Sequence, residues 1–231
     1  MARPSEHDLI RWSEALAAIA RTGLGFSESL YERERFEEIL HVAAEIKNAA
    51  QTVSQIEGGI VSKEELVSEW LKSVGVGVPG YVTPKVAIGA VVGNDKGELL
   101  LIQRADSGVW LYPTGWADVG YSPSEVVVKE VLEETGIEVE PQRLIAVLDG
   151  MRLGFTRVPL YSLVFQCSVI GGDLKPHPLE CKNVGWFAQD QLPQPLAGHG
   201  QWVEMVFKAI RGEEMGPVFD IPRNPVWTKE T

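Results

Sequence analysis

A short acidic helix with well-marked ends constrains this chain more than any other segment. Residues 115–137 read GWADVGYSPSEVVVKEVLEETGI, and their three adjacent glutamates would share an arc of about 100° on a helix. The three glutamates are Glu130, Glu133 and Glu134. Val128 and Leu132 would then point the other way, into a core. Carboxylate oxygens are the ligands that Mg²⁺ prefers, often together with substrate phosphates. The pattern therefore predicts a metal site for phosphate chemistry.

The ends of this helix can be read from single residues. Ser122 is a good N-cap, Pro123 fits the first helical position, and Glu125 completes a capping box with Ser122. Gly136 follows the last turn, where a left-handed backbone is favoured. We therefore expect a helix that begins at Pro123 and ends just before Gly136.

A row of glutamates alone is more typical of a solvated helix face than of a metal site. Two further features favour the metal site here. Gly115 and Gly120 punctuate the loop that leads into the helix, and an apolar run with hairpin-like ends precedes that loop.

These residues resemble the Nudix box, G-x5-E-x7-R-E-U-x-E-E-x-G-U, in which U is aliphatic. The aligned residues are Gly115, Tyr121, Lys129, Glu130, Val131, Glu133, Glu134, Gly136 and Ile137. Tyr121 stands where the family has glutamate, and Lys129 stands where it has arginine. The family pairs these two side chains to tie the loop to the helix. We therefore expect a less rigid loop, while the metal-binding glutamates are retained.

The resemblance to the Nudix family extends to the strands on both sides of the box. Expected strands and connecting segments lie at 83–92, 97–104, 110–116, 144–148, 160–167 and 181–192. The resemblance implies an α+β fold, a Nudix α/β/α sandwich with a mixed sheet, preceded by a small all-α N-terminal domain. The expected boundaries are 1–75 for the helical domain, 76–82 for a linker, 83–214 for the catalytic domain and 215–231 for a surface tail.

The N-terminal segment has the apolar spacing of three helices. The first would use Leu9, Trp12, Leu16 and Ile19, and the second Phe36, Ile39, Ala43, Ile46, Ala50 and Val53. Ser62 and Glu65 form a second capping box that opens the third helix. The second row is close to a heptad repeat. It is interpreted as a plain bundle core, as a homodimer interface, or as part of a cover over the active site.

Composition and charge exclude several classes of protein. The chain has 231 residues, is 45% hydrophobic and 23% charged, and can bury a core. It has no apolar run of about 20 residues to span a membrane, and its N-terminus does not resemble a signal peptide. Its two cysteines suit a reducing cytoplasm. A net charge of −11 argues against a nucleic-acid binder, which needs basic residues for phosphates.

The resemblance covers the whole chain and implies a bacterial subgroup that hydrolyses nucleoside diphosphates linked to a second group X, such as CDP-choline or ADP-ribose. The products would be a nucleoside monophosphate and phosphorylated X, with Mg²⁺ or Mn²⁺ as cofactor. We expect Glu130 and Glu134 to bind the metal, with Glu133 as a ligand or as the base. Glu180, on a later loop, is a further candidate for the base.

Substrate binding needs cations for the phosphates and aromatic rings for the base. Arg104 and Lys129 are the candidate cations. Trp110, Tyr112, Trp116 and Tyr121 lie beside the box, and the last two are the better candidates for stacking because they lie on the loop itself.

Two other functions remain as alternatives. A non-catalytic Nudix-like regulator would sense nucleotides, although it could lose the three glutamates that this chain keeps. A hydrolase of nucleoside triphosphates would release pyrophosphate instead of a phosphorylated X.

Overall fold

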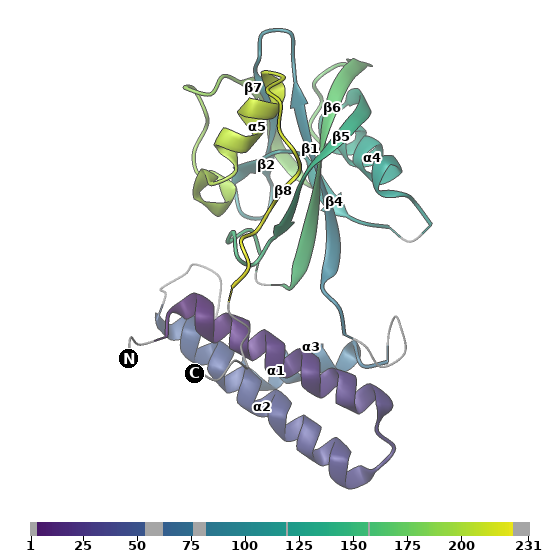
Figure 1. Cartoon of the computed structure of the whole chain (residues 1–231), viewed down its shortest axis with the longest axis vertical. Coiled ribbons are helices and arrows are strands. Elements are labelled where there is room, and N and C mark those ends of the chain that lie inside the picture. Colours follow the sequence, from purple (N-terminus) through teal and green to yellow (C-terminus); the bar gives the residue numbers. More distant parts are fainter. Residues whose placement is uncertain (1–3, 54–61, 76–81, 119, 157, 224–231) are drawn as a thin grey trace. The chain divides into compact units, whose positions relative to one another are not determined.

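The computed structural model describes residues 4–53, 62–75, 82–118, 120–156 and 158–223 (Figure 1). The chain divides into a helical unit, which comprises the residues up to Thr83 and also Arg223, and a unit from Pro84 to Pro222. The predicted linker 76–82 lies outside the described residues except for Val82, as do the last eight residues of the predicted tail. No helix in the described ranges is long and apolar enough to cross a membrane.

The helical unit contains three helices, as the apolar spacing predicts. They are α1 (Glu6–Phe26), α2 (Leu30–Val53) and α3 (Lys63–Lys72). The predicted capping box at Ser62 is confirmed, because its hydroxyl accepts from the Glu65 amide while the Glu65 carboxylate accepts from the Ser62 amide. Ser5 and Asp8 form an equivalent box at the start of α1.

The buried face of α1 differs from the predicted one. Trp12 and Ile19 are 39% and 59% exposed, whereas Ala17 and Ala20 are fully buried. These alanines share a core cluster with Ala43 and Ala44 of α2. Of the predicted row, Leu16 packs against this cluster and Leu9 is partly buried. The prediction was therefore wrong for Trp12 and Ile19. Small residues allow two helices to approach closely, and this close approach decides the face that α1 buries.

The predicted apolar row of α2 contributes in part to the core of the unit. Ala43 and Ala50 are fully buried, and Phe36 and Ile39 pack against the core cluster. The side chain of Val53 lies outside the described part of the structure. A buried ion pair, Glu14 with Lys47, also links α1 to α2.

The second unit is built on one mixed sheet of eight strands in the order β3-β2-β1-β6-β5-β8, with β4 paired to β1 and β7 to β2. The strands are β1 (Lys85–Gly93), β2 (Leu99–Arg104), β3 (Trp110–Leu111), β4 (Thr114–Trp116), β5 (Ile137–Asp149), β6 (Leu160–Gly172), β7 (Cys181–Phe187) and β8 (Val218–Phe219). Parallel pairing of β1 with β6 and antiparallel pairing of β5 with β6 make the sheet mixed, as expected.

Two helices, α4 (Pro123–Thr135) and α5 (Val203–Ile210), cover opposite faces of this sheet (Figure 1). Successive residues of a strand point to opposite faces. In β1, accordingly, Ile88 and Ala90 belong to the core cluster of α4, and Val91 belongs to that of α5. Burial on both faces explains why β1 and β2 are continuous apolar runs. The predicted α/β/α sandwich is confirmed.

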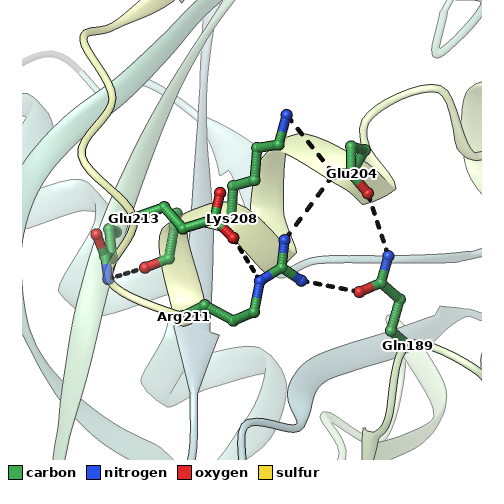
Figure 2. A network of polar contacts seen from close by, with 7 residues as sticks. Gln189, Glu204, Lys208, Arg211 and Glu213 are labelled. Carbon is green, nitrogen blue, oxygen red and sulfur yellow. Dashed lines mark hydrogen bonds and ion pairs between the residues drawn. The ribbon is translucent and has the colours of Figure 1, made fainter.

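The outer surface of α5 carries a network of charged and amide groups (Figure 2). Arg211 lies at its centre and donates to Glu213 at 2.6 Å and to Gln189 at 3.0 Å, while Gln189 donates to Glu204 at 3.3 Å. Lys208 forms an ion pair with Glu204 at 3.6 Å. These exposed contacts link the end of α5 to the chain on both sides of it.

After α5 the chain returns to the sheet. Val218 and Phe219 of β8 pair in parallel with Ala146 and Val147 of β5. This edge strand has only two residues and both are exposed, so it shows no alternation of buried and exposed side chains from which a strand could be predicted. The last described segment of the chain thus lies beside the end of β5.

Candidate active site

Helix α4 has the ends that its sequence predicts. The Ser122 hydroxyl accepts from the Glu125 amide at 3.3 Å, and the Glu125 carboxylate accepts from the Ser122 amide at 2.6 Å. Gly136 closes the helix with φ of 75°, which favours glycine. These local interactions fix the register in which the acidic side chains leave the helix.

The three glutamates of α4 lie in different environments. Glu134 is 3% exposed and accepts a hydrogen bond of 2.8 Å from the Thr114 amide of β4. Glu130 is half-buried, and Glu133 is exposed. The acidic arc therefore runs from solvent at Glu133 into the space between the helix and the loop before it.

The apolar side of α4 differs from the prediction at one position. Leu132, which was expected to face the core with Val128, is 46% exposed, whereas Val128 is partly buried against the core. Val127 and Val131 are fully buried. The buried side is therefore rotated toward Glu134, whose carboxylate contacts the Thr114 amide of β4.

Gly115 leaves space at the contact between β4 and α4. A Cβ atom built on Gly115 would lie 2.1 Å from the carboxyl carbon of Glu130. Any side chain at this position would therefore displace the Glu130 carboxylate.

Burial makes the acidic site costly to ionise. It raises the pKa of Glu134 to about 8, and the negative charge of Glu130 adds to the effect, while the Thr114 amide and Arg104 oppose it. Burial also raises the pKa of Glu130, with added repulsion from Glu133 and Glu180. A bound cation would remove this cost, because opposite charge favours the ionised form.

Lys129 has a different partner from the one the resemblance suggests. Its Nζ lies 2.7 Å from Asp118 Oδ2 and 3.8 Å from Glu133 Oε2. Tyr121, at the position of the family's glutamate, is 56% exposed. The loop is therefore tied to the helix by a charge pair through Asp118. The expectation of a less rigid loop stays a prediction. Asp118 was not among the predicted site residues, although it is an acidic residue of the same loop.

Arg104 also has an acidic partner, Asp106, which was not among the predicted site residues. It donates to both carboxylate oxygens of Asp106, at 3.0 and 2.7 Å. Arg104 thereby holds the pKa of Asp106 well below its usual range. The guanidinium is consequently held in one orientation at the edge of the site.

A cavity of about 1010 Å³ brings most of the predicted site residues together. Its lining includes Arg104, Gly115, Trp116, Lys129, Glu130, Glu133, Glu134 and Glu180. Tyr121 and Gly136 are not among the described residues that line it. Gly136 instead has its capping role at the end of α4. The cavity therefore combines an acidic wall with two cations and one indole ring.

The aromatic candidates separate into exposed and buried rings. Trp116 is 47% exposed, and Lys85 Nζ lies 5.1 Å from the centre of its ring. Trp110 and Tyr112 are 7% and 2% exposed and belong to the core. Of the four rings, Trp116 is therefore the one both exposed and at the cavity.

Glu180 approaches the acidic cluster from the loop before β7. Its backbone carbonyl accepts from the Ala105 amide at 2.7 Å, and its negative charge raises the pKa of both Glu130 and Glu134. His177 Nδ1 lies 3.9 Å from Glu180 Oε2. Glu180 is exposed, so its carboxylate is open to water in the cavity.

The donors of this site suit a hard cation that also binds phosphate. Within the described ranges, no three acidic, histidine or cysteine side chains form a ready coordination set. Mg²⁺ commonly uses one or two carboxylates and completes its shell with water and substrate phosphate oxygens. Glu130 and Glu134 could supply those carboxylates.

Each of the two parts of the chain matches a known family. Residues 83–206 match the family described as NUDIX domain. Residues 7–57 match the family described as UDP-X-like, N-terminal oligomerisation domain. The two matches fall on the sandwich and on the helical unit respectively.

Individual proteins resemble the chain over nearly its full length. A Bacillus subtilis protein provisionally named as an ADP-ribose pyrophosphatase, YjhB, is 30% identical over 90% of this chain and 95% of its own. A crystal structure of UDP-X diphosphatase covers 94% of this chain and 100% of its own, with 27% identity and a TM-score of 0.55. An ADP-ribose pyrophosphatase structure from Streptococcus suis covers 60% of this chain and 100% of its own, with 35% identity and a TM-score of 0.52.

Proposed function

Because this chain belongs to the Nudix family of hydrolases, we propose that it cleaves the diphosphate bond of a nucleoside diphosphate linked to a second group X. ADP-ribose, UDP-linked groups and CDP-choline are the candidate substrates. The products would be a nucleoside monophosphate and phosphorylated X. The observation that carries the proposal is the cavity whose wall holds Glu130, Glu133, Glu134 and Glu180.

Glu130 and Glu134 are the proposed ligands of Mg²⁺ or Mn²⁺. Their half-buried and buried carboxylates carry raised pKa values, and the Arg104 guanidinium nearby is already paired with Asp106. A divalent cation at this point would neutralise phosphate charge and lower the pKa of a water molecule. The protein supplies the orientation, since the Thr114 amide holds one oxygen of Glu134.

The reaction needs a base that takes a proton from the attacking water. As the water oxygen bonds to one phosphorus, the bond between that phosphorus and the bridging oxygen breaks, and the bridging oxygen leaves with X phosphate or with the nucleotide. Glu133 and Glu180 are the two candidates for the base. Both line the cavity, and each has one basic neighbour, since Glu133 lies 3.8 Å from Lys129 and Glu180 lies 3.9 Å from His177.

Substrate orientation is assigned to three residues of the lining. Arg104 and Lys129 present positive charge near the acidic wall and would contact the diphosphate. Trp116 presents an exposed indole face on which a nucleobase could stack. Tyr121, the other candidate ring, is less favoured because it lies outside the described lining of the cavity.

We also propose that the helical unit forms a homodimer through the outward side of α1. Trp12 and Ile19 expose large apolar surfaces there, at 39% and 59%. The match to an N-terminal oligomerisation domain over residues 7–57 supports this assignment. Exposed apolar patches of this kind commonly mark protein contacts.

The test is a panel of ADP-ribose, UDP-glucose, CDP-choline and ATP, each with Mg²⁺ and with Mn²⁺, with the products identified by mass spectrometry. The expected result is AMP with ribose 5-phosphate, or the equivalent pair from another diphosphate. Pyrophosphate released from ATP at a higher kcat/KM would favour a triphosphate hydrolase. Tight nucleotide binding without turnover would favour a non-catalytic regulator.

A further inference from the structure

The loop between β5 and β6 forms one wall of the substrate cavity. Gly154, Phe155 and Thr156 of this loop line it. The loop is folded onto the end of β5, because the Leu153 amide donates to the Asp149 carbonyl at 3.1 Å and the Phe155 amide donates to the Gly150 carbonyl at 2.9 Å. The position of this wall therefore depends on what holds the turn at Asp149.

The side of this loop that faces the cavity is held by packing. The Phe155 ring meets the Tyr112 ring edge to face, with centroids 6.4 Å apart. It also packs closely on Gly198, where an added Cβ atom would lie 2.5 Å from the ring. A shift of the turn at Asp149 would therefore be transmitted to a ring that lines the cavity.

The opposite side of the loop is held by the C-terminal segment. Asp220 Oδ2 accepts a hydrogen bond of 2.6 Å from the Asp149 amide, and Asp220 Oδ1 lies 3.9 Å from Arg152 Nε. Arg152 Nη1 also donates to the Ile221 carbonyl. One carboxylate thus contacts the first residue of the turn and a side chain three residues later.

Strand β8 places Asp220 at this position. Val218 and Phe219 pair with Ala146 and Val147, so the next residue of the chain reaches the end of β5. Asp220 lies beyond residue 206, where the match to the NUDIX domain ends. The contact is therefore an addition to the part of the chain that the family description covers.

We propose that Asp220 is a positioning residue for the substrate. It holds the loop from Asp149 to Thr156 in the shape that completes the cavity, so the C-terminal segment helps to select which nucleotide conjugate binds. This inference rests on the proposed function. Asp220 does not line the cavity among the described residues, and it acts through the loop.

The variants Asp220→Ala and Asp220→Asn test the proposal, with Glu213→Ala as the matched control. Glu213 is an acidic residue of the same C-terminal segment and pairs with Arg211, away from the cavity lining. We expect Asp220→Ala to raise KM for the best diphosphate substrate about five-fold or more, with kcat within about two-fold of wild type. Asp220→Asn keeps an acceptor for the Asp149 amide and should restore most of the KM.

Hydrogen–deuterium exchange of residues 149–156 provides a readout that does not depend on turnover. Exchange should become faster in Asp220→Ala and remain unchanged in Glu213→Ala. An unchanged KM in Asp220→Ala, or an equal rise in Glu213→Ala, would overturn the inference. Unchanged exchange in the loop would do the same.

The failure of the proposed function gives a different pattern. If wild-type protein cleaves no diphosphate in the panel, that function is wrong, and the inference is then judged by calorimetric binding of ADP to wild type and Asp220→Ala. Weaker binding together with faster exchange would support the positioning role. Equal binding would overturn it. If Asp220→Ala fails to fold, Arg152→Ala replaces it with the same expected outcomes.

Discussion

The Lys129 ammonium lies 2.7 Å from the Asp118 carboxylate, and this pair ties the loop before α4 to the helix itself. It lies where the family's arginine and glutamate would pair, with the acid supplied three residues earlier in the loop than Tyr121. Forming this ion pair does not require either charged group to be buried, because both side chains are partly exposed. Its consequence is geometric, since this loop follows β4, whose Gly115 lies against Glu130.

Replacing Asp118 by asparagine should reduce catalysis more than stability. An exposed ion pair contributes little to folding, so the melting temperature should fall by no more than about 3 °C. We expect kcat/KM to fall about three- to ten-fold, because the loop between β4 and α4 is no longer tied to the helix that carries Glu130. Asp95→Asn, in the exposed β1–β2 turn, is the control. Equal kinetics in both variants would show that the pair does not position the loop.

Replacing Glu134 by glutamine should abolish most metal-dependent turnover. The change removes one negative charge at nearly constant shape, and the glutamine oxygen can still accept from the Thr114 amide. We expect kcat to fall about 100-fold or more, since a metal ion stabilises such a reaction by several kcal/mol. Glu138→Gln, just after the helix, is the control. Turnover within a few fold of wild type would disprove the assignment of Glu134 as a ligand.

The stability of the metal-free protein should decrease as the pH rises toward 8. Burial raises the pKa of Glu134 from 4.5 to about 8, so the folded protein binds a proton that the unfolded chain has lost. The stabilisation is complete below pH 4.5 and is lost as the pH rises through about 8. Thermal melts in EDTA should therefore show a falling melting temperature over this window and a flatter profile in Glu134→Gln.

Adding Mg²⁺ should reverse this trend in the wild type, because a ligand that binds the folded state stabilises it. Glu134→Gln should respond less to Mg²⁺ at pH 8. A parallel pH profile for both proteins in EDTA would argue that Glu134 is not the group that titrates.

Replacing Trp116 by alanine should weaken substrate binding. Stacking of a base on an aromatic ring contributes about 1–3 kcal/mol, which corresponds to roughly five- to 150-fold in KM. Trp116→Phe should lose less, because it keeps a ring. Tyr121→Ala is the control, as Tyr121 is exposed outside the described lining of the cavity. A larger KM change in Tyr121→Ala would transfer the stacking role to that residue.

Introducing a charge on the outward side of α1 should disrupt the proposed dimer. We expect Trp12→Glu and Ile19→Glu to lower the mass measured by light scattering to that of one chain. Leu71→Glu, at an apolar position of α3 that is 38% exposed, is the control. Retention of the wild-type mass in both α1 variants would place the interface elsewhere.

The sequence predicts those features that depend on neighbouring residues. The ends of α4 follow from Ser122, Glu125 and Gly136, which lie within the helix or next to it. Strands β1 and β2 follow from continuous apolar runs, because both faces of the sheet are covered. The interactions that end α4 span only a few residues. The residues of β1 and β2 are buried along most of each strand, so no choice between faces has to be predicted.

Features that depend on long-range packing were predicted less well. The core face of α1 is set by Ala17 and Ala20 against α2, and hydrophobic spacing gives more weight to Trp12 and Ile19. The hydrogen bond between Asp149 and Asp220 joins residues 71 positions apart. Apolar periodicity carries no information about such a polar contact, so the role of the C-terminal segment could not be inferred.

The contact between Gly115 and Glu130 has a consequence for altering this protein. Gly115 is not among the described glycines with positive φ, so its hydrogen atom matters for clearance and not for backbone freedom. Library designs that vary β4 and the loop after it should therefore leave position 115 untouched, even though alanine there would be compatible with the backbone. The absence of a side chain at position 115 leaves the space that the Glu130 carboxylate occupies.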